Sequence, residues 1–437
     1  MRLAIPASIG MVFNTLYNLT DFWFAGQLSS DALAGVSIAG SVFFLLLALG
    51  LGIQIGAAAL IAPIAGQSGD DDERRGSIAD WVDQILGLSL VLSLVVLIAG
   101  LLVATPLVHF LGAEVNTVAP LALEYIGTIL WGAFTFILTF AAAGALMALG
   151  DTHSNRNALA IGFVANLGLN PLLTFGLDMG VTGLALATVL IKGASALYLY
   201  RVLTRRLGRR CRPRFSSDKW AALLRQTIPA SGNMLTIILG GFITVALIGR
   251  FGSQHVAGYS VGLRLEQVLL LPALGLNSAV MAIAGQNLGA GHLDRVRQIY
   301  TIGLQLGLAM AAVFIPIMVF LSPVLMGFFS DDPDIQHTGA IYLKIDAIAF
   351  YAYVVLFLST ATLQALKQPM FPLILGVARQ LVIPASINYW LIVYQGFPMI
   401  SIFYTIISVV VISSLIAHGY TLRQLGKLQV NTPATSA

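Results

Sequence analysis

The segment Gln84–His109 reads QILGLSLVLSLVVLIAGLLVATPLVH and contains no aspartate, glutamate, lysine or arginine. A helix needs about 20 predominantly apolar residues to cross the roughly 30 Å hydrocarbon core of a bilayer. Residues 84–109 are therefore long enough and apolar enough to form a transmembrane helix.

The rest of the chain repeats this pattern. Hydrophobic residues make up 58% of the 437 positions and charged residues only 10%, against about 25% charged in soluble domains. Strands of a membrane β-barrel would be shorter and would alternate apolar with polar residues. The sequence therefore predicts an all-α integral membrane protein with twelve transmembrane helices. Beside 84–109, the predicted spans are 4–27, 38–64, 122–148, 156–176, 180–202, 225–250, 257–286, 299–327, 339–366, 371–393 and 398–421.

The basic residues predict how the chain is oriented. Most of the 23 lysines and arginines lie at the two termini or in even-numbered loops, such as the long segment 201–225. Since cytoplasmic loops carry an excess of Lys and Arg, both termini and this segment are expected in the cytoplasm, with the protein in the inner membrane. The net charge of +4 then follows from topology, and no nucleic-acid partner is expected.

Segment 201–225 contains the densest basic run of the chain. Its arginines could bind anionic lipid headgroups, but a linker that fixes topology is the favoured interpretation. Cys211 is the only cysteine, which excludes an internal disulfide and a thiolate metal site. The run comprises Arg201, Arg205, Arg206, Arg209, Arg210, Arg212 and Arg214.

The two halves of the sequence resemble each other. A shift of 223 residues places Ile5-Pro6-Ala7-Ser8 on Ile228-Pro229-Ala230-Ser231, and Gly52 on Gly275. Six spans per half is an even number, so both halves enter the membrane in the same direction. We expect two pseudo-symmetric six-helix bundles that form a central cavity. The expected parts are a lobe at 1–202 with a cation site, a cytoplasmic linker at 203–224, a second lobe at 225–421 and a cytoplasmic tail at 422–437.

A few polar residues within the spans could carry chemistry. Asp21 lies inside the first span, where a charge is costly, and it is either a proton carrier or a carboxyl hydrogen-bonded near the outer interface. Asn166 and Asn170 are four residues apart and share one helix face. With Thr188, they could complete a proton or Na⁺ site, or simply hold helices together.

The second half has no counterpart of Asp21, because position 244 is a threonine. It carries Arg264 and Glu266 in the eighth span and Arg379 in the eleventh. A structural ion pair with Arg379 is favoured over a role in lining the cavity. Lys192 and Lys344 are expected to extend their ammonium groups toward the ends of their spans.

Several chemistries have no matching motif. The chain contains no G-x-x-x-x-G-K-[ST] loop, which argues against ATP hydrolysis by that route, and neither H-E-x-x-H nor G-x-S-x-G. An intramembrane enzyme would need a nucleophile or a metal constellation at membrane depth. We therefore expect no enzyme and no cofactor.

The sequence resembles the multidrug and toxic compound extrusion (MATE) family of twelve-span antiporters. The resemblance covers nearly the whole chain and is carried by five segments. These are Ile5-Pro6, Leu16-Tyr17-Asn18-Leu19-Thr20-Asp21, Ala32-Leu33-Ala34-Gly35-Val36, Arg264-Leu265-Glu266 with Leu271-Pro272-Ala273-Leu274-Gly275, and the specific run Gly285-Gln286-Asn287-Leu288-Gly289-Ala290-Gly291.

The resemblance implies roles for several residues. Asp21 would belong to a cation site, with Asn166, Thr188 and the aromatic Tyr17 around it. Pro6 would be the point where the first helix bends, whereas the chain itself favours a tolerated proline in the first helical turn.

Two departures from the family pattern bear on the coupling ion. Asn170 stands where many prokaryotic members have an aspartate, and NorM-type acids are missing at Ile237 and near Val354. The pattern is closer to DinF-like members, and H⁺ is preferred to Na⁺ as the coupling ion.

The resulting prediction is a secondary antiporter, usually monomeric in this family, that exports small organic and often cationic compounds. The alternative is a flippase for lipid-linked oligosaccharide or a related precursor. That alternative requires a strongly cationic cavity to hold phosphates, and only Arg264 and Arg379 are suitably placed.

Overall fold

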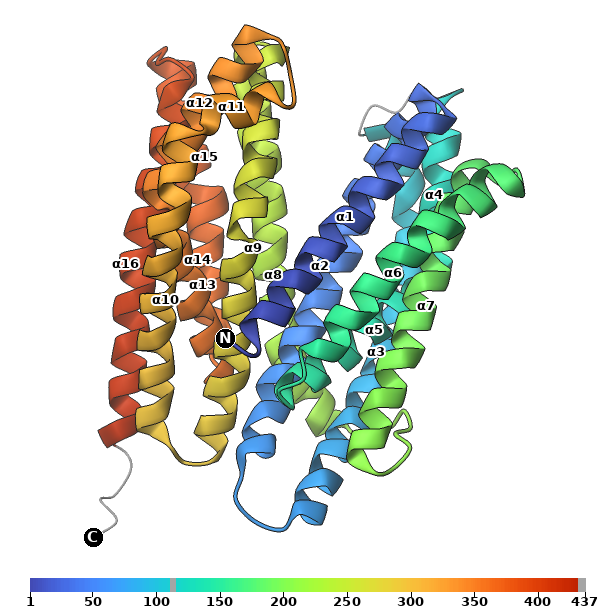
Figure 1. The fold of residues 1–437 in the computed structure, drawn as a ribbon, viewed down its shortest axis with the longest axis vertical. Coiled ribbons are helices and arrows are strands. Elements are labelled where there is room, and N and C mark those ends of the chain that lie inside the picture. Colours follow the sequence, from blue (N-terminus) through green and yellow to red (C-terminus); the bar gives the residue numbers. More distant parts are fainter. Residues whose placement is uncertain (111–114, 431–437) are drawn as a thin grey trace. The chain divides into compact units, whose positions relative to one another are not determined.

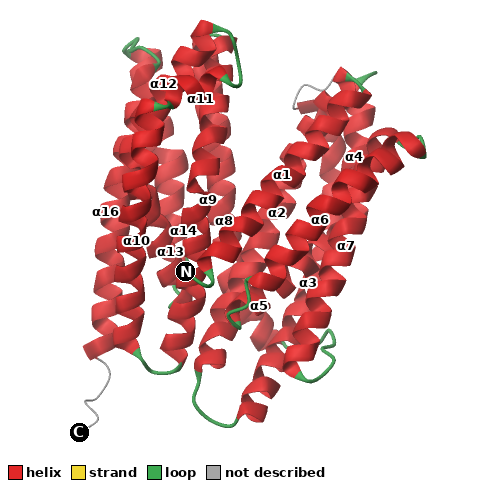
Figure 2. Ribbon diagram, viewed as in Figure 1, coloured by secondary structure: helices red, strands yellow, loops and turns green. Residues whose placement is uncertain are grey.

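The computed structural model describes residues 1–110 and 115–430, and these ranges fold into helices joined by short loops, with no strand among them (Figures 1 and 2). Each predicted span coincides with one helix or with a run of consecutive helical elements. In the first half these are α1 (Ala4–Leu28), α2 (Ser30–Gly66), α3 (Asp71–Phe110), α4 (Val118–Trp131), α5 (Ala133–Ala148), α6 (His153–Pro171) with the π-helix η1 (Leu172–Gly176), and α7 (Gly180–Leu207).

The second half repeats the order. Its elements are α8 (Ser217–Ile248) with η2 (Gly249–Phe251), α9 (Ser253–Gly289), α10 (Leu293–Phe320), α11 (Ser322–Gly327), α12 (Pro333–Asp346) with η3 (Ala347–Ala349), α13 (Phe350–Ala365), α14 (Met370–Val377), η4 (Ala378–Val382), α15 (Ile383–Tyr389), η5 (Trp390–Tyr394) and α16 (Ile400–Val430).

Length and composition identify most of these helices as membrane spans. Within the described ranges, ten helices are long and apolar enough to cross a bilayer, and α4 with α5, bent by 51°, would make an eleventh span. Helix α1 has 25 residues and carries Asn14, Asn18 and Asp21, and it is not among these ten helices. The candidate acidic residue thus lies on a predicted span that length and composition alone do not identify.

The chain forms two compact units. The N-terminal unit contains Ile9–Ser231, and the C-terminal unit contains Leu3–Ser8 together with the chain from Gly232 onward. The chain therefore passes between the units inside two helices, at Ser8–Ile9 in α1 and at Ser231–Gly232 in α8. Predicted segment 203–224 lies wholly within the N-terminal unit.

The same contact occurs once in each unit. In the C-terminal unit, a Cβ atom added to Gly275 would lie 2.6 Å from the Ala4 carbonyl oxygen. In the N-terminal unit, a Cβ atom added to Gly52 would lie 2.7 Å from the Thr227 carbonyl oxygen. Backbone packs on backbone at both places, so no larger residue fits without a shift. The sequence repeat thus corresponds to a repeated helix contact.

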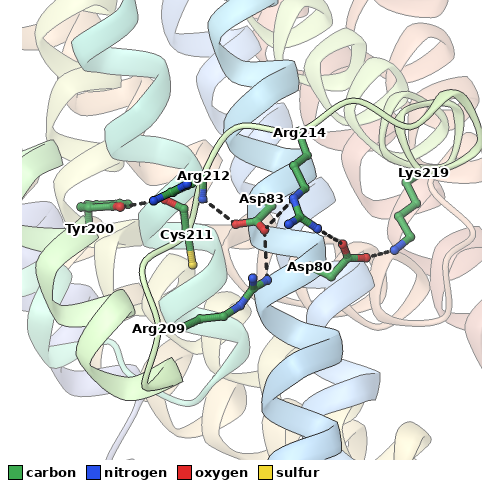
Figure 3. A network of polar contacts seen from close by, with 8 residues as sticks. All are labelled: Asp80, Asp83, Tyr200, Arg209, Cys211, Arg212, Arg214 and Lys219. Atoms are coloured by element: carbon green, nitrogen blue, oxygen red, sulfur yellow. Dashed lines mark hydrogen bonds and ion pairs between the residues drawn. The ribbon is translucent and has the colours of Figure 1, made fainter.

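The interhelical linker is bound to α3. Helix α7 ends at Gly208, which adopts the left-handed conformation (φ 69°) that glycine adopts without strain. The buried Asp83 carboxylate then accepts hydrogen bonds from the Arg209 guanidinium (3.0 Å) and the Arg212 backbone N–H (2.7 Å) (Figure 3). Arg214 adds an ion pair to Asp83 at 3.6 Å. The linker is therefore held against the N-terminal unit.

These contacts engage much of the basic run. Arg206 pairs with Asp151 at 2.8 Å, while Lys219 pairs with Asp80. Arg206, Arg209 and Arg214 are thus paired with acids of the same unit.

Cys211 is enclosed by this network. Its side chain is buried, and its carbonyl oxygen accepts a hydrogen bond from the Tyr200 hydroxyl at 2.8 Å (Figure 3). Burial, followed by the nearby Asp83 carboxylate, raises the pKa of the Cys211 thiol to about 11. The thiol is therefore almost entirely protonated at neutral pH, in a form that reacts poorly with electrophiles.

We predict that Cys211 is labelled slowly by a maleimide at pH 8 and at least about tenfold faster in Asp83→Asn. The substitution removes the anion that disfavours the thiolate and loosens the linker that covers the thiol, so both effects act in the same direction. Labelling rates of the purified protein test this, with Asp80→Asn as the control, because Asp80 pairs with Lys219 and Arg214 but does not act on the thiol. Equal rates in wild type and Asp83→Asn would contradict the proposed linker contact.

Candidate functional site

Asp21 is held at the centre of a polar cluster in the N-terminal unit. It lies on α1 and is only 6% exposed. Its Oδ1 accepts hydrogen bonds from the side-chain amides of Asn166 and Asn170, both at 2.8 Å, and its Oδ2 accepts one from the Thr188 hydroxyl at 3.2 Å. The structure therefore joins the four residues that the sequence singled out separately.

The local fold explains why these donors converge. Asn166 and Asn170 are fully buried on one face of α6, and the Asn170 amide also donates to Asn166 Oδ1 at 3.2 Å. Helix α6 ends at Pro171 and continues as the π-helix η1, an irregularity that is common at functional sites. Gly183 lets α7 approach η1, because a Cβ there would lie 2.8 Å from the Leu173 carbonyl carbon.

The aromatic lining of the cluster comes from two helices. Tyr17 precedes Asp21 by one helical turn on α1 and is buried, as is Tyr125 on α4. Both tyrosines interact electrostatically with the Asp21 carboxylate. The resemblance implied an aromatic neighbour at Tyr17, and the structure places that residue beside the cluster.

The position of Lys192 differs from the position expected from the sequence. Its side chain was expected to extend toward a span end, but α7 runs from Gly180 to Leu207, which places Lys192 near the middle of the helix. Its ammonium lies 5.5 Å from the centroid of the Tyr17 ring and interacts electrostatically with Asp21. The cluster thus contains a cation that the sequence analysis did not assign to it.

The C-terminal unit holds a second buried acidic cluster. Glu266 on α9 accepts a hydrogen bond from the Tyr342 hydroxyl of α12. Asp346 at the end of α12 is 1% exposed, and its Oδ1 accepts from the Tyr353 hydroxyl at 3.4 Å. Among the described residues, its Oδ2 has no hydrogen-bond partner. The sequence analysis left Asp346 unassigned because its depth depended on where the tenth span begins.

The prediction of an ion pair between Glu266 and an arginine in this unit is wrong. Within residues 1–110 and 115–430, Glu266 forms no ion pair with Arg264 or Arg379, and its contact is Tyr342. Arg264 is exposed whereas Glu266 is buried, as two residues two positions apart on a helix should be. Arg379 lies in η4 and interacts electrostatically with Tyr353. A phenol therefore replaces the predicted guanidinium as the partner of Glu266.

Pro6 lies in the first turn of α1, which begins at Ala4. A proline there removes no intrahelical hydrogen bond, because the first N–H groups of a helix have no partner within it. It stands two residues before the point where α1 leaves one unit and enters the other. Its position is that of the tolerated proline favoured by the sequence.

A family model described as MatE matches residues 6–172 and 229–390, one copy in each half of the chain. The chain belongs to the MATE family. Members of this family are transporters, so the prediction of a transporter rather than an enzyme is confirmed. The duplicated match also agrees with the internal repeat seen in the sequence.

Individual relatives agree with this assignment. The chain is 28% identical over 391 residues to a FAD transporter of Shewanella oneidensis, covering 87% of this chain and 84% of that protein. It is 24% identical over 428 residues to the probable multidrug resistance protein YoeA of Bacillus subtilis, covering 95% and 91%. A FAD transporter and a probable multidrug resistance protein are therefore among the relatives that match over most of their length.

Solved structures confirm the architecture. A MOP superfamily transporter from Pyrococcus furiosus superposes with a TM-score of 0.90 at 22% identity, covering 98% of this chain and 95% of that one. A MATE protein in complex with MaL6 gives the same TM-score and identity. The twelve-helix fold of two six-helix lobes is thereby confirmed for this MATE protein.

The contribution of the hydrogen bonds to Asp21 can be measured as a change in the free energy of unfolding. Asn166→Ala should lower the free energy of unfolding by about 1–3 kcal/mol, since it removes a donor from a buried carboxylate. In an Asp21→Asn background the cost should be smaller, because the acceptor is neutral. Thermal unfolding of purified protein measures both, and the double-mutant cycle isolates the pair.

Asn157→Ala is the matched control for this cycle. Asn157 lies on the same helix, and its Oδ1 accepts from Arg156. Its replacement should change stability by less than about 0.5 kcal/mol. An equal cost of Asn166→Ala in both backgrounds would show that the amide acts only through packing.

Proposed function

We propose that this MATE protein is a secondary antiporter that exports small organic compounds across the inner membrane in exchange for protons. The observation that supports this most directly is the buried carboxyl of Asp21, which accepts hydrogen bonds from neutral donors of two other helices. A carboxyl at membrane depth is costly and is typical of proton relays in transporters.

The donor set favours a proton over Na⁺. A hard cation needs several oxygen ligands, yet the Asn166, Asn170 and Thr188 side chains direct hydrogen atoms at Asp21. Among the described residues of the cluster, Asn170 Oδ1 is a buried oxygen that no donor occupies. The position where an aspartate would add a second charge holds this neutral amide. Protonation of one oxygen of Asp21 requires no shell of oxygen ligands.

The proposed cycle follows from the same contacts. A proton arriving from outside neutralises Asp21 and weakens its three hydrogen bonds, which loosens α1 from α6 and α7. The first residues of α1, up to Ser8, belong to the C-terminal unit, and the helix enters the N-terminal unit at Ile9. Pro6 lies close to this point, so a movement of α1 affects both units. Substrate is released outward in this step, and loss of the proton to the cytoplasm resets the site.

The relatives guide the choice of substrates. Several are named as multidrug export or multidrug resistance proteins, and one is named as a FAD transporter. Cationic dyes are therefore the first substrates to test, and FAD is the second. Both termini and the linker are placed in the cytoplasm in this proposal, in accordance with the positive-inside rule.

We predict that cells producing the wild type export ethidium, and that Asp21→Asn or a proton uncoupler reduces export at least about tenfold. Asparagine preserves the shape of the side chain but cannot carry a proton. Varying the external Na⁺ concentration should have no effect. Dye fluorescence in whole cells measures all three conditions.

Asp31→Asn is the control, since Asp31 is an exposed acid in the first turn of α2. This variant should export like the wild type. Full export by Asp21→Asn would refute the proposed coupling role, and would direct attention to Glu266 and Asp346. Efflux of FAD from loaded vesicles, assayed in the same variants, extends the test to an anionic substrate.

A further inference from the structure

Lys192 and Asp21 face the same space between α1 and α7. Lys192 follows Thr188 by one helical turn on α7, and Tyr17 precedes Asp21 by one turn on α1, so each pair shares a helix face. Thr188 donates to Asp21, and the Lys192 ammonium lies 5.5 Å from the centroid of the Tyr17 ring. These two contacts place the ammonium beside the carboxylate cluster.

The backbone of α7 around Lys192 packs against α5. Lys192 is half-buried near the middle of α7, and its backbone carbonyl accepts a hydrogen bond from Thr139 of α5 at 3.1 Å. On the next residue, a Cβ on Gly193 would lie 3.5 Å from the Thr135 methyl group. Helix α7 thus packs on α5 around residues 192 and 193. The Lys192 side chain points toward Tyr17 of α1.

The charges around Asp21 are few. Helix α6 contributes the neutral amides Asn166 and Asn170, α4 contributes Tyr125, and α1 contributes Tyr17. In the described part of the chain, Lys192 is the cation that interacts electrostatically with Asp21. With Lys192 charged, the cluster is neutral when Asp21 is ionised and carries one positive charge when Asp21 is protonated.

This balance bears on ion selectivity. A Na⁺ ion that approached Asp21 would meet a fixed ammonium in a region of low dielectric constant, where charges interact more strongly than in water. At Asp21 it would also meet the hydrogen atoms of the Asn166 and Asn170 amides, which leaves Asn170 Oδ1 as a free amide oxygen of the cluster. A proton, by contrast, can transfer to the carboxylate without occupying the space of a cation.

We propose that Lys192 is the ion-selectivity residue of this site: a tethered cation that takes the place of Na⁺ beside Asp21 and leaves only protons able to neutralise it. The proposal rests on the role of Asp21 in the proposed function and names the residue that determines which ion acts there. Lys192 acts through Asp21 and is a positioning residue rather than a proton carrier.

Na⁺ binding to the purified full-length protein tests this. Binding of ²²Na⁺ is measured at pH 7 in wild type, Lys192→Gln, Lys192→Arg, and the double variant Lys192→Gln/Asp21→Asn. We expect Lys192→Gln to bind Na⁺ at least about tenfold more tightly than wild type, because one repelling charge is removed. The double variant should lose that binding, and Lys192→Arg should remain like wild type because the charge is retained.

Lys344→Gln is the matched control. Lys344 is an exposed lysine on α12 in the other unit, and its replacement removes the same charge without touching Asp21. It should bind no more Na⁺ than wild type. Elution of each variant as a single peak from a size-exclusion column establishes that it is folded.

The outcomes separate this proposal from the function it rests on. Wild-type Na⁺ binding as tight as that of Lys192→Gln, or a gain in Lys192→Gln that survives Asp21→Asn, would overturn the role of Lys192 while leaving proton-coupled export intact. Na⁺-stimulated dye export in Lys192→Gln but not in Lys192→Arg would support it further. Uncoupler-insensitive export by the wild type would instead refute the proposed function.

Discussion

The buried Asp21 carboxylate is the constraint on which the N-terminal unit depends. An ionised group inside a bilayer-spanning bundle is stable only when its hydrogen-bonding capacity is met. Here α6 and α7 supply the donors, which requires Asn166 and Asn170 on one face, the π-helix after Pro171, and the close approach of α7 at Gly183. The carboxylate thereby determines where three helices meet.

The same unit contains a second buried carboxylate with different partners. Asp83 is held by two guanidinium groups and a backbone N–H of the linker, whereas Asp21 is held mainly by neutral amides and a hydroxyl. Cationic partners favour the ionised form of an acid strongly, and neutral donors favour it less. Asp83 thus fixes the linker to α3 through charged partners, whereas Asp21 joins α1 to α6 and α7 mainly through neutral ones, although both are acids on α-helices of one unit.

Much of this arrangement could be predicted from the sequence. The spans follow from the lengths of the apolar stretches, and the pairing of Asn166 with Asn170 follows from helix periodicity. Lys192 was assigned wrongly, because the distance of a lysine from a span end depends on where α7 begins and ends. The Glu266–Tyr342 contact could not be predicted either: nothing in one sequence indicates which residue of α12 faces α9, and a charged partner is the usual expectation for a buried acid.

The repeat explains why the two halves do not share one chemistry. A shift of 223 places Thr244 at the position of Asp21, and the Thr244 hydroxyl bonds to Gly240 within its own helix at 2.9 Å. Conversely, Phe43 occupies the position of Glu266 and packs edge-on against Phe136 at 5.4 Å. Each half therefore has a buried acid where the other has a side chain that needs no hydrogen-bond partner from another helix. Backbone contacts such as those at Gly52 and Gly275 repeat in both units, so duplication preserved the packing of the helices while the polar interior of each unit diverged.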